Sequence, residues 1–490
     1  MERAELARLL RVSLARSRSG GPADGVSQCA GRVAESRDTV VVEEREPERF
    51  CAAFAEAVAA GGTVFLANPD WGPDERAQFN ALRDAKAQHP TSTIQHSTSA
   101  GQSAMARGEG RGAGRAASKI GDLKFEARTG ERTQFSESAR SESKIQIPKS
   151  EIATGWLCIP TGGSAGRIKL ARHDQDTLQA AVMGFCTHFG VARVNVIGVL
   201  PLHHVGGLLG WLRAELTGGR FLSCPWKEIE ASFAETAEAN AGRRPDPTKF
   251  AGGCFLSLVP TQLQRLLAWP AAVAWLRGFR AVLVGGGPAW AELAEAGARA
   301  GLPLAFTYGA TETAAAVAAL RPEEFLTGGR GCGTALPHAQ ITAGAEGGLL
   351  VEAESLFRGY WPDRRAPGAW PTDDTGFFDQ RGSLHVTGRR DAVIITGGEK
   401  VEPGEVEAVL RATGEFADVA VIGVPDAEWG EAVVACYPAG GRAPDLAHVA
   451  AGLTVLAAWK RPKRLVAVAV GEWPRDAAGK IDRAALRSVR

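Results

Sequence analysis

The sequence lacks the features that mark secreted, membrane-spanning and zinc-binding proteins. Its eight cysteines are scattered, without a C-x-x-C pair or histidines at zinc-finger spacing, so neither a disulfide framework nor a cysteine zinc site is indicated. No apolar run approaches the roughly 18 residues that a membrane helix needs, and the charged N-terminus lacks the apolar core of a signal peptide. These absences predict reduced thiols, a cytoplasmic location and no membrane insertion.

A strong charge of one sign is also missing. Lysine and arginine nearly balance aspartate and glutamate, which leaves a net charge of +1, while 45% of the 490 residues are hydrophobic. This balance gives no global electrostatic reason to bind nucleic acid or an acidic membrane. The length suffices for two or three domains. Partners must therefore be inferred from local sites, and we expect small molecules and no nucleic acid.

One long segment, residues 86–149, has very few aromatic residues, only Phe125 and Phe135, and is rich in Ser, Thr, Gln, Gly and Arg. Such a composition cannot bury enough apolar area to offset chain entropy, so a disordered insertion is predicted. The segment holds 11 Lys and Arg against 6 Asp and Glu, a difference of 11 − 6 = +5. It could attract RNA or another polyanion, or it could be a solvated linker without a ligand.

The rest of the chain shows an alternation that is typical of an α/β fold. A helix is expected at residues 48–60, and short β-branched runs then alternate with helical patterns, as in a parallel sheet with crossover helices. A compact α+β unit follows residue 388. We predict a large N-terminal domain, residues 1–388, and a small mobile C-terminal domain, residues 389–490. The expected strands are residues 194–200, 254–259, 281–284, 304–308, 391–395, 418–423, 432–436 and 465–470, with a further helix at 404–411.

A loop rich in glycine and hydroxyl side chains, residues 161–169, follows an apolar run and ends in a lysine. Glycines let successive backbone N–H groups converge on an anion, and the hydroxyls and the lysine add donors and charge for a polyphosphate. The spacing matches neither the Walker loop nor G-x-G-x-x-G, and a flexible surface loop is the alternative. The candidate phosphate ligands are Thr161, Gly162, Gly163, Ser164, Gly166 and Lys169.

Further short motifs lie downstream of this loop, several of them at the ends of predicted strands, where ligands of parallel sheets usually bind. In order and spacing the whole set resembles the adenylate-forming superfamily, which includes acyl-CoA synthetases, nonribosomal-peptide adenylation domains and luciferases. The resemblance covers residues 153–486. The motifs are residues 200–207, 285–288, 308–313, 372–376, 387–391, 397–403 and 479–483.

Two of these motifs favour a slot for adenine. The strand-end glycines Gly286 and Gly287 have no side chains, so a flat base could lie against their backbone, and Tyr308 offers an aromatic face. The resemblance extends this nucleotide site to Pro288 and Gly309.

Glu312 is a hard oxygen ligand suited to Mg²⁺ held between protein and triphosphate, and Thr311 can donate to a phosphate oxygen. The resemblance implies these roles. A surface glutamate near a helix N-terminus is the other interpretation of Glu312.

The resemblance implies that Asp374 accepts both ribose hydroxyls, that Arg389 reaches the ribose and that Asp391 is the hinge of a mobile domain. The sequence reads Asp373-Asp374 where the family usually has Thr-Gly-Asp, so the local backbone and the role of Asp374 are open. An aspartate that only forms an ion pair, or a plain turn aspartate, is the alternative.

The resemblance also assigns Lys480 to the α-phosphate, where its charge would assist attack by the substrate carboxylate. Rotation of the C-terminal domain would then replace the lysine by Gly397 and Gly398, which line the pantetheine tunnel in the family.

His204 and Gly207 match family residues near the acyl site, although the adjacent His203 leaves the choice of histidine open. Arg213 lies one to two helical turns past Gly207 and is the candidate cation for a second substrate carboxylate.

These residues imply a ligase that uses ATP, Mg²⁺ and coenzyme A to convert an aromatic keto-dicarboxylic acid to its CoA thioester through an acyl-AMP. Another aryl- or acyl-CoA synthetase is the first alternative, because pocket shape decides the substrate. A non-catalytic protein that binds a polyanion through residues 86–149 is the second. The sequence does not decide the oligomeric state, and a homodimer is one expectation.

Overall fold

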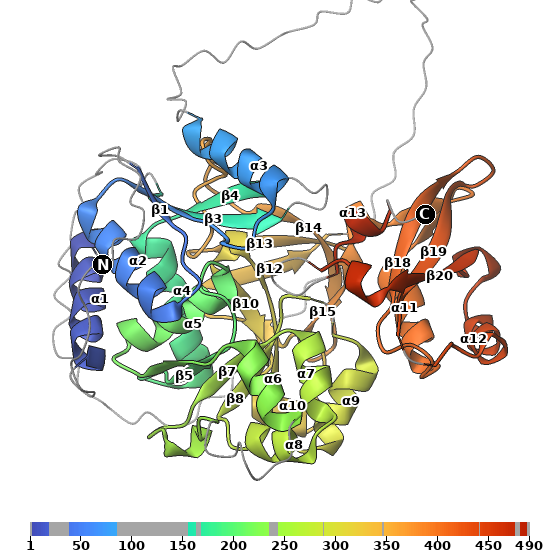
Figure 1. Ribbon diagram of the computed structural model, residues 1–490, viewed down its shortest axis with the longest axis horizontal. Coiled ribbons are helices and arrows are strands. Elements are labelled where there is room, and N and C mark those ends of the chain that lie inside the picture. Colours follow the sequence, from blue (N-terminus) through green and yellow to red (C-terminus); the bar gives the residue numbers. More distant parts are fainter. Residues whose placement is uncertain are drawn as a thin grey trace, which may run out of the picture. The chain divides into compact units, whose positions relative to one another are not determined.

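The structure is a computed structural model (Figure 1) that describes residues 2–18, 39–85, 155–162, 168–234, 244–287, 289–344, 347–440, 442–475 and 481–487. The predicted insertion at residues 86–149 lies outside these ranges. Outside them also lie five predicted site residues: Gly163, Ser164, Gly166, Pro288 and Lys480. Within the described ranges, no helix is both long and apolar enough to cross a membrane.

A seven-stranded sheet with the order β11-β10-β9-β8-β7-β5-β6 confirms the predicted parallel sheet. Its strands from β6 to β9 pair in parallel, and β10 and β11 add antiparallel pairs at one end. The predicted strand at 281–284 is fully buried, as expected of a central parallel strand. The strands are β5 (Val196–Gly198), β6 (Phe221–Ser223), β7 (Phe255–Leu258), β8 (Ala281–Val284), β9 (Leu304–Ala310), β10 (Ala315–Ala319) and β11 (Thr334–Ala335).

Helices connect these strands and pack on them (Figure 1). Helix α5 contacts β5, β6 and β7, and α10 contacts β9. The helices of this part are α4 (Gln175–Phe189), α5 (Val205–Leu216), α6 (Trp226–Ala234), α7 (Pro260–Leu267), α8 (Pro270–Leu276), α9 (Ala291–Arg299) and α10 (Pro322–Leu326).

A second sheet has the order β1-β2-β3-β4, with parallel pairs except for the antiparallel hairpin β3–β4. The helix expected at 48–60 is α2, where Phe50, Phe54 and Val58 recur every four residues and are buried on one face. The elements are α1 (Arg3–Arg18), β1 (Thr39–Val42), α2 (Pro47–Ala60), β2 (Thr63–Leu66), α3 (Pro73–Asp84), β3 (Leu157–Gly162) and β4 (Ile168–His173).

A third, antiparallel sheet has the order β12-β13-β14-β15. It matters for function because its last pair aligns Asp374 with Arg389. Asp374 pairs with Arg389 of β15, and a bulge follows between Thr375 and Gly376. The pairing of β14 with β13 shifts register between Pro371 and Thr375, so the strand is irregular around the position of the missing glycine. The strands are β12 (Ala339–Ala343), β13 (Gly348–Ala353), β14 (Trp370–Phe378) and β15 (Leu384–Arg389).

The remaining residues form the predicted α+β unit around a fourth sheet. Helix α11 buries Val406 and Leu410, and Val409 packs at the edge of the same core. The prediction of a strand at 391–395 is wrong at its start. Arg390–Ala392 form a 3-10 turn, and strand pairing begins only at Ile394. The elements are β16 (Ile394–Thr396), β17 (Glu399–Val401), α11 (Pro403–Ala412), β18 (Ala420–Asp426), β19 (Gly430–Ala439), α12 (Leu446–Gly452), β20 (Arg464–Ala469) and α13 (Arg483–Leu486).

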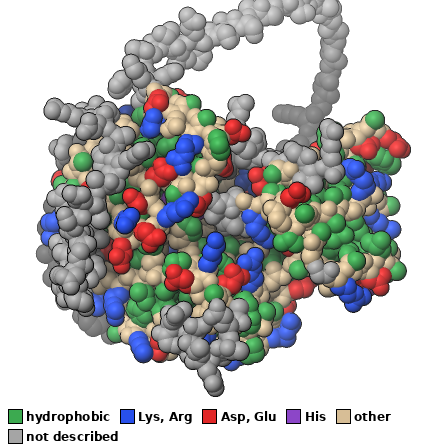
Figure 2. Space-filling model, in the orientation of Figure 1, with side chains coloured by type: hydrophobic (Ala, Val, Ile, Leu, Met, Phe, Trp, Pro, Cys, Tyr) green, Lys and Arg blue, Asp and Glu red, His purple; other side chains and the backbone are tan. Residues whose placement is uncertain are grey.

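The described cysteines are all free thiols, and most are buried. On the face drawn in Figure 2, basic and acidic side chains are intermixed, which agrees with the near-zero net charge. The exact domain boundary at residue 388 stays a prediction.

Candidate functional site

The predicted phosphate loop joins the two strands of the hairpin β3–β4. Thr161 lies opposite Lys169, and Gly162 lies opposite Ile168, in antiparallel register. The hairpin therefore holds Thr161 and Lys169 at the two bases of the loop, while residues 163–167 lie outside the described ranges. Lys169 is exposed, and its Nζ lies 5.0 Å from the ring centroid of Tyr360. A cation at this distance is attracted by the aromatic face.

Glu312 lies in a single 3-10 turn, Thr311–Thr313, that follows strand β9. Its side chain is 7% exposed, and Oε1 accepts a hydrogen bond of 2.6 Å from the Tyr360 hydroxyl. Among the described residues, no lysine, arginine or histidine forms an ion pair with Glu312. Burial of a carboxylate without a cation is costly, so the turn holds a negative charge suited to an incoming cation.

The surroundings of Glu312 fit a metal ion that is shared with a substrate. No group of three metal-ligating side chains occurs among the described residues. Mg²⁺ is commonly bound by one or two carboxylates together with substrate phosphate oxygens rather than by a protein cage. Glu312 thus fits Mg²⁺ that arrives with a triphosphate.

Three predicted nucleotide residues meet at strands β9, β14 and β15. The Tyr308 hydroxyl donates to Asp374 Oδ2 at 2.8 Å, and Arg389 Nη1 lies 3.5 Å from Asp374 Oδ1. Burial, together with the negative charge of Asp374, raises the pKa of Tyr308, so its phenol stays protonated and remains a donor. The neighbouring Asp373 is largely exposed and also pairs with Arg389, at 3.3 Å.

Glycine stands at the predicted site positions for different structural reasons. Gly286 has a φ of +76°, which favours glycine. A Cβ on Gly309 would lie 2.0 Å from the Ala315 carbonyl oxygen, so this glycine lets β10 approach β9 closely. A Cβ on Gly287 would meet nothing closer than 3.9 Å, which leaves space beside its backbone. Gly287 therefore fits the expected surface for a base, whereas the absence of a side chain at Gly309 has a packing explanation.

The acyl-site candidates surround the start of helix α5. His203 is buried, and burial lowers its pKa to about 3, whereas His204, at the N-cap of α5, is less buried. The two rings lie 4.4 Å apart. A Cβ on Gly207 would lie 2.2 Å from the Pro201 carbonyl oxygen, so this position requires glycine for the first turn of the helix.

Arg213 is a buried cation on the same helix. It is 4% exposed, its Cζ lies 4.0 Å from the ring centroid of Phe185, and burial lowers its pKa to about 10. Among the described residues, its Nε has no hydrogen-bond partner. The charge is therefore available to an anion that enters this region.

His338 lies near Arg213, and the sequence reasoning missed it. Burial, and next the charge of Arg213, lowers the pKa of His338 to about 4, so the ring is neutral. Both ring nitrogens lack partners, and the ring packs where a Cβ on Gly184 would lie 1.8 Å from Nδ1. Residues 184, 213 and 338 are far apart along the chain, so no local motif indicates that His338 lies near Arg213. The one feature of the sequence that is related to this contact is the glycine at position 184 within a helix.

The sequence reasoning also missed Tyr360. Its hydrogen bond to Glu312 joins positions 48 residues apart, and no local pattern pointed to it.

The C-terminal site residues occupy two turns. Gly397 and Gly398, with φ of +58° and +83°, connect β16 to β17. Trp429 packs against Gly397, where a Cβ would lie 3.0 Å from Cε3. Asp391 falls within the 3-10 turn Arg390–Ala392. Lys480 lies outside the described residues.

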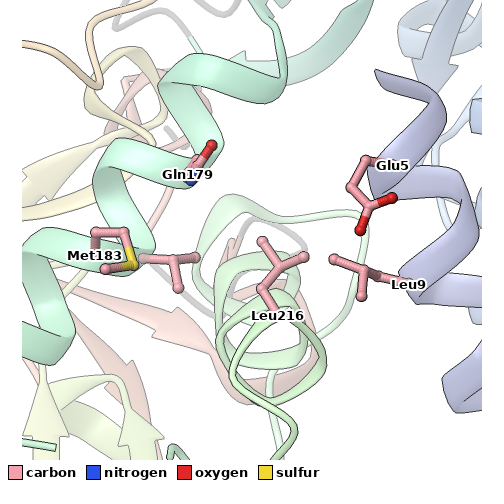
Figure 3. Close-up of a pocket in the computed structure, with 6 residues that line it drawn as sticks. Glu5, Leu9, Gln179, Met183 and Leu216 are labelled. Carbon is pink, nitrogen blue, oxygen red and sulfur yellow. The ribbon is translucent and has the colours of Figure 1, made fainter. Parts of the chain in front are cut away.

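A separate pocket of about 310 Å³ lies among helices α1, α4 and α5 (Figure 3). It shares no residue with the predicted adenylate site. Its lining consists of Glu5, Leu9, Gln179, Val182, Met183 and Leu216.

Comparisons with known proteins identify the family of the chain. Residues 32–361 match the AMP-binding enzyme family, and residues 405–480 match the AMP-binding enzyme C-terminal domain. An indoleacetate–CoA ligase of Aromatoleum aromaticum is 31% identical over 70% of this chain and 68% of its own length. A 2-succinylbenzoate–CoA ligase of Geobacillus kaustophilus is 35% identical over 69% of each chain.

Among solved structures, the o-succinylbenzoate CoA synthetase of Bacillus subtilis in complex with its acyl-adenylate intermediate has a TM-score of 0.66. It covers 99% of this chain and 93% of its own at 19% identity, which supports the fold. The match of the family model over most of the chain, together with relatives above 30% identity, shows that this protein belongs to the AMP-binding enzyme family, whose members include the CoA ligases.

Proposed function

We propose that this chain is an AMP-forming ligase that converts 2-succinylbenzoate to 2-succinylbenzoyl-CoA, a step of menaquinone biosynthesis. ATP and coenzyme A are the co-substrates, and Mg²⁺ is the metal. The observation that carries the proposal is the meeting of Tyr308, Asp374 and Arg389. A hydrogen bond joins the hydroxyl to the carboxylate and an ion pair joins the carboxylate to the guanidinium, which is a set suited to a nucleoside.

In the first half-reaction, the substrate carboxylate attacks the α-phosphorus of ATP, and pyrophosphate leaves. Thr161, Gly162 and Lys169 would hold the triphosphate, together with loop residues outside the described ranges. Glu312 would hold Mg²⁺, which supplies charge neutralisation on the phosphate oxygens when bound. Lys480 would add positive charge at the α-phosphate.

In the second half-reaction, the thiol of coenzyme A attacks the acyl carbon of the acyl-AMP, the thioester forms and AMP leaves. The thiol must reach the acyl carbon from a side that the lysine would otherwise occupy. A rotation about Asp391 would bring Gly397 and Gly398 to that side. The turn that these glycines form at positive φ supplies backbone without side chains, which suits the passage of a thin pantetheine arm.

The substrate proposal depends on the buried cation. A keto-dicarboxylic acid retains one carboxylate after the other is activated, and that carboxylate needs a partner away from water. Arg213 is a buried cation with a free Nε donor, and the neutral His338 offers ring nitrogens without partners. Together they could hold the second carboxylate. His204, at the N-cap of α5, would position the reacting end.

A second candidate function follows from the relatives. The indoleacetate–CoA ligase of Aromatoleum aromaticum is similar to this chain at an identity close to that of the 2-succinylbenzoate relatives. A substrate with a single carboxylate would leave Arg213 without an anion. We therefore rank another aryl-CoA ligase activity second.

Pyrophosphate release across a panel of acids distinguishes the two functions. We expect kcat/KM for 2-succinylbenzoate to exceed that for indoleacetate and benzoate by at least roughly tenfold, because each good charged contact contributes about 1.5–3 kcal/mol. A preference for indoleacetate would overturn the proposed substrate while leaving the ligase activity intact.

The alternative of a polyanion-binding protein makes the opposite prediction for residues 86–149. Deletion of this segment should abolish function if it binds the ligand and should scarcely change ligase activity under our proposal. The cytoplasmic location and a homodimer also stay predictions, and light scattering of the purified chain tests the second.

A further inference from the structure

We propose that Tyr360 is a positioning residue that orients Glu312 toward the metal ion and ties this carboxylate to Lys169 of the phosphate loop. The inference rests on the proposed function, because it assumes that Glu312 receives Mg²⁺ with ATP. Tyr360 does not touch the reacting atoms in this scheme, and it acts through Glu312.

The hydrogen bond between the two side chains fixes one oxygen of the carboxylate. The Tyr360 hydroxyl donates to Glu312 Oε1 at 2.6 Å, within the range of short hydrogen bonds to an ionised acceptor. The phenol is the donor in this pair, because an ionised carboxylate can only accept a hydrogen bond. No described residue donates to Oε2, which therefore stays available to a cation.

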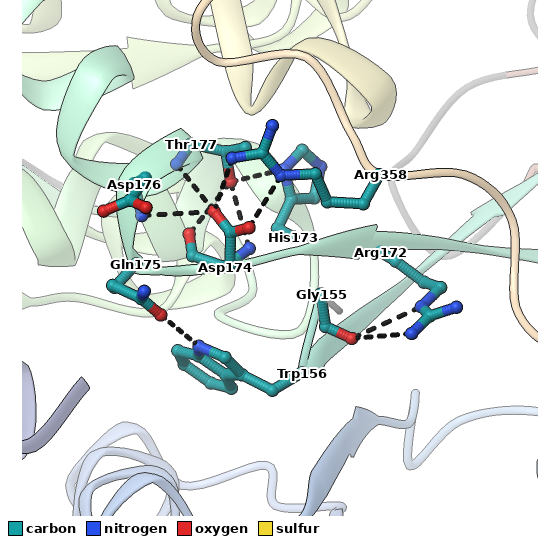
Figure 4. A network of polar contacts seen from close by, with 9 residues as sticks. All are labelled: Gly155, Trp156, Arg172, His173, Asp174, Gln175, Asp176, Thr177 and Arg358. Carbon is teal, nitrogen blue, oxygen red and sulfur yellow. Dashed lines mark hydrogen bonds and ion pairs between the residues drawn. The ribbon is translucent and has the colours of Figure 1, made fainter. Parts of the chain in front are cut away.

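The backbone around Tyr360 is hydrogen-bonded to strand β4, which fixes the position from which the ring extends. Tyr360 forms an isolated bridge with Ala171, and Trp361 N donates to the Leu170 carbonyl oxygen at 2.8 Å. Two residues before Tyr360, the Arg358 guanidinium pairs with the buried Asp174 at 2.6 Å (Figure 4). Asp174 also caps helix α4, so the ion pair connects the Tyr360 segment to a rigid helix start.

The backbone that carries Glu312 is pinned to the same strand. His173, the last residue of β4, donates from Nε2 to the Thr311 carbonyl oxygen at 2.8 Å. Its Nδ1 lies 3.1 Å from Thr177 Oγ1 (Figure 4). Phe357 N donates to the Glu312 carbonyl oxygen at 2.8 Å. The backbone segments that carry Tyr360 and Glu312 are thus both bound to β4. These backbone contacts set the distance between the two side chains.

The face of the same ring holds the cation of the phosphate loop. Lys169 is also on β4, and its Nζ lies 5.0 Å from the Tyr360 centroid. Tyr360 therefore contacts both the predicted triphosphate lysine and the predicted metal carboxylate. No other described side chain links Lys169 to Glu312 in this way.

The test is the coupling between Mg²⁺ and ATP, measured by calorimetry as the ratio of the ATP Kd in EDTA to the ATP Kd in Mg²⁺. Tyr360→Phe removes only the hydroxyl. We expect this ratio to fall roughly tenfold or more, because partners behind a metal ligand typically contribute about 10- to 100-fold in metal affinity, while the Kd in EDTA stays unchanged. Tyr437→Phe, which removes a hydroxyl in the α+β unit, is the matched control and should leave the ratio at the wild-type value.

Two further variants separate positioning from folding. Glu312→Asp keeps the charge but withdraws the carboxylate from the hydroxyl by one methylene, so it should reproduce the loss even if Tyr360→Phe folds poorly. In a Glu312→Gln background, Tyr360→Phe should cause no further fall in the ratio, because the two residues act in series.

Each outcome decides the inference. An unchanged ratio in Tyr360→Phe overturns it and leaves the proposed function standing. An equal loss of ATP affinity in Mg²⁺ and in EDTA also overturns it, because the ring would then have only a structural role. A wild-type protein whose ATP binding does not respond to Mg²⁺ would overturn the metal role of Glu312 in the proposed function as well.

Discussion

Asp374 and Arg389 face each other across strands β14 and β15, and the carboxylate of Asp374 also accepts the hydroxyl of Tyr308. This single carboxylate therefore connects strand β9 of the seven-stranded sheet to strand β15 of the antiparallel sheet. It lies where three separate segments converge, which is the position that a nucleoside-binding group requires.

Asp374→Asn should raise the KM for ATP by roughly 10- to 100-fold, because hydrogen bonds to a charged group contribute about 1.5–3 kcal/mol. Pyrophosphate release at varied ATP measures the effect. The exposed neighbour supplies the control, since Asp373→Asn removes a charge whose side chain is 62% exposed and should change KM little. Equal effects of the two variants would contradict the assignment of Asp374.

Arg213→Ala should raise the apparent Kd for 2-succinylbenzoate by about 10- to 100-fold through loss of a buried charged contact. Binding of benzoate, which has no second carboxylate, should scarcely change. Thermal melting of the ATP complex checks that the variant is folded. An unchanged affinity for 2-succinylbenzoate in a folded variant would show that Arg213 does not bind the substrate.

Lys480→Ala should slow adenylate formation by roughly 10²- to 10³-fold, the effect typical of a lost electrostatic stabiliser. Thioester formation from supplied acyl-AMP should be largely retained. Single-turnover assays of each half-reaction make the comparison. Lys460→Ala serves as the control, because Lys460 already pairs with Glu405 at 2.6 Å. Equal losses in both half-reactions would count against alternating domain positions.

Stability should fall as the pH falls through the range in which His173 takes up a proton. Burial lowers the pKa of His173 from 6.5 to about 4. Between these values the unfolded chain binds the proton and the folded chain does not, so the stability is complete above pH 6.5 and declines toward pH 4. The contribution is at most about 3 kcal/mol.

His173→Gln is the informative variant, because an amide can still donate to the Thr311 carbonyl oxygen but does not titrate. Urea midpoints at pH 7.5 and pH 5 should differ less in this variant than in the wild type. His203 and His338 are present in both proteins, so their protonation changes the stability of both equally and does not affect the difference between them. The same pH sensitivity in both proteins would show that His173 is not responsible.

The sequence by itself determined the elements whose pattern is local. The uninterrupted apolar run at 281–284 became β8, and the four-residue spacing of Phe50, Phe54 and Val58 became the buried face of α2. Such patterns are readable because burial follows the period of each element. The strand predicted at 391–395 failed at its start because a one-turn 3-10 helix has no period long enough to detect.

Only the tertiary structure decided which side chains meet. The motif predicts Glu312 to be a metal ligand, but its contact with Tyr360 depends on residues 358–361 lying along strand β4. The proximity of Arg213 and His338 likewise depends on a helix packing beside a later segment, with a glycine at 184 that admits the ring. Local sequence encodes periodicity, whereas these contacts arise from sheet pairing and close packing between distant segments, which no short window contains.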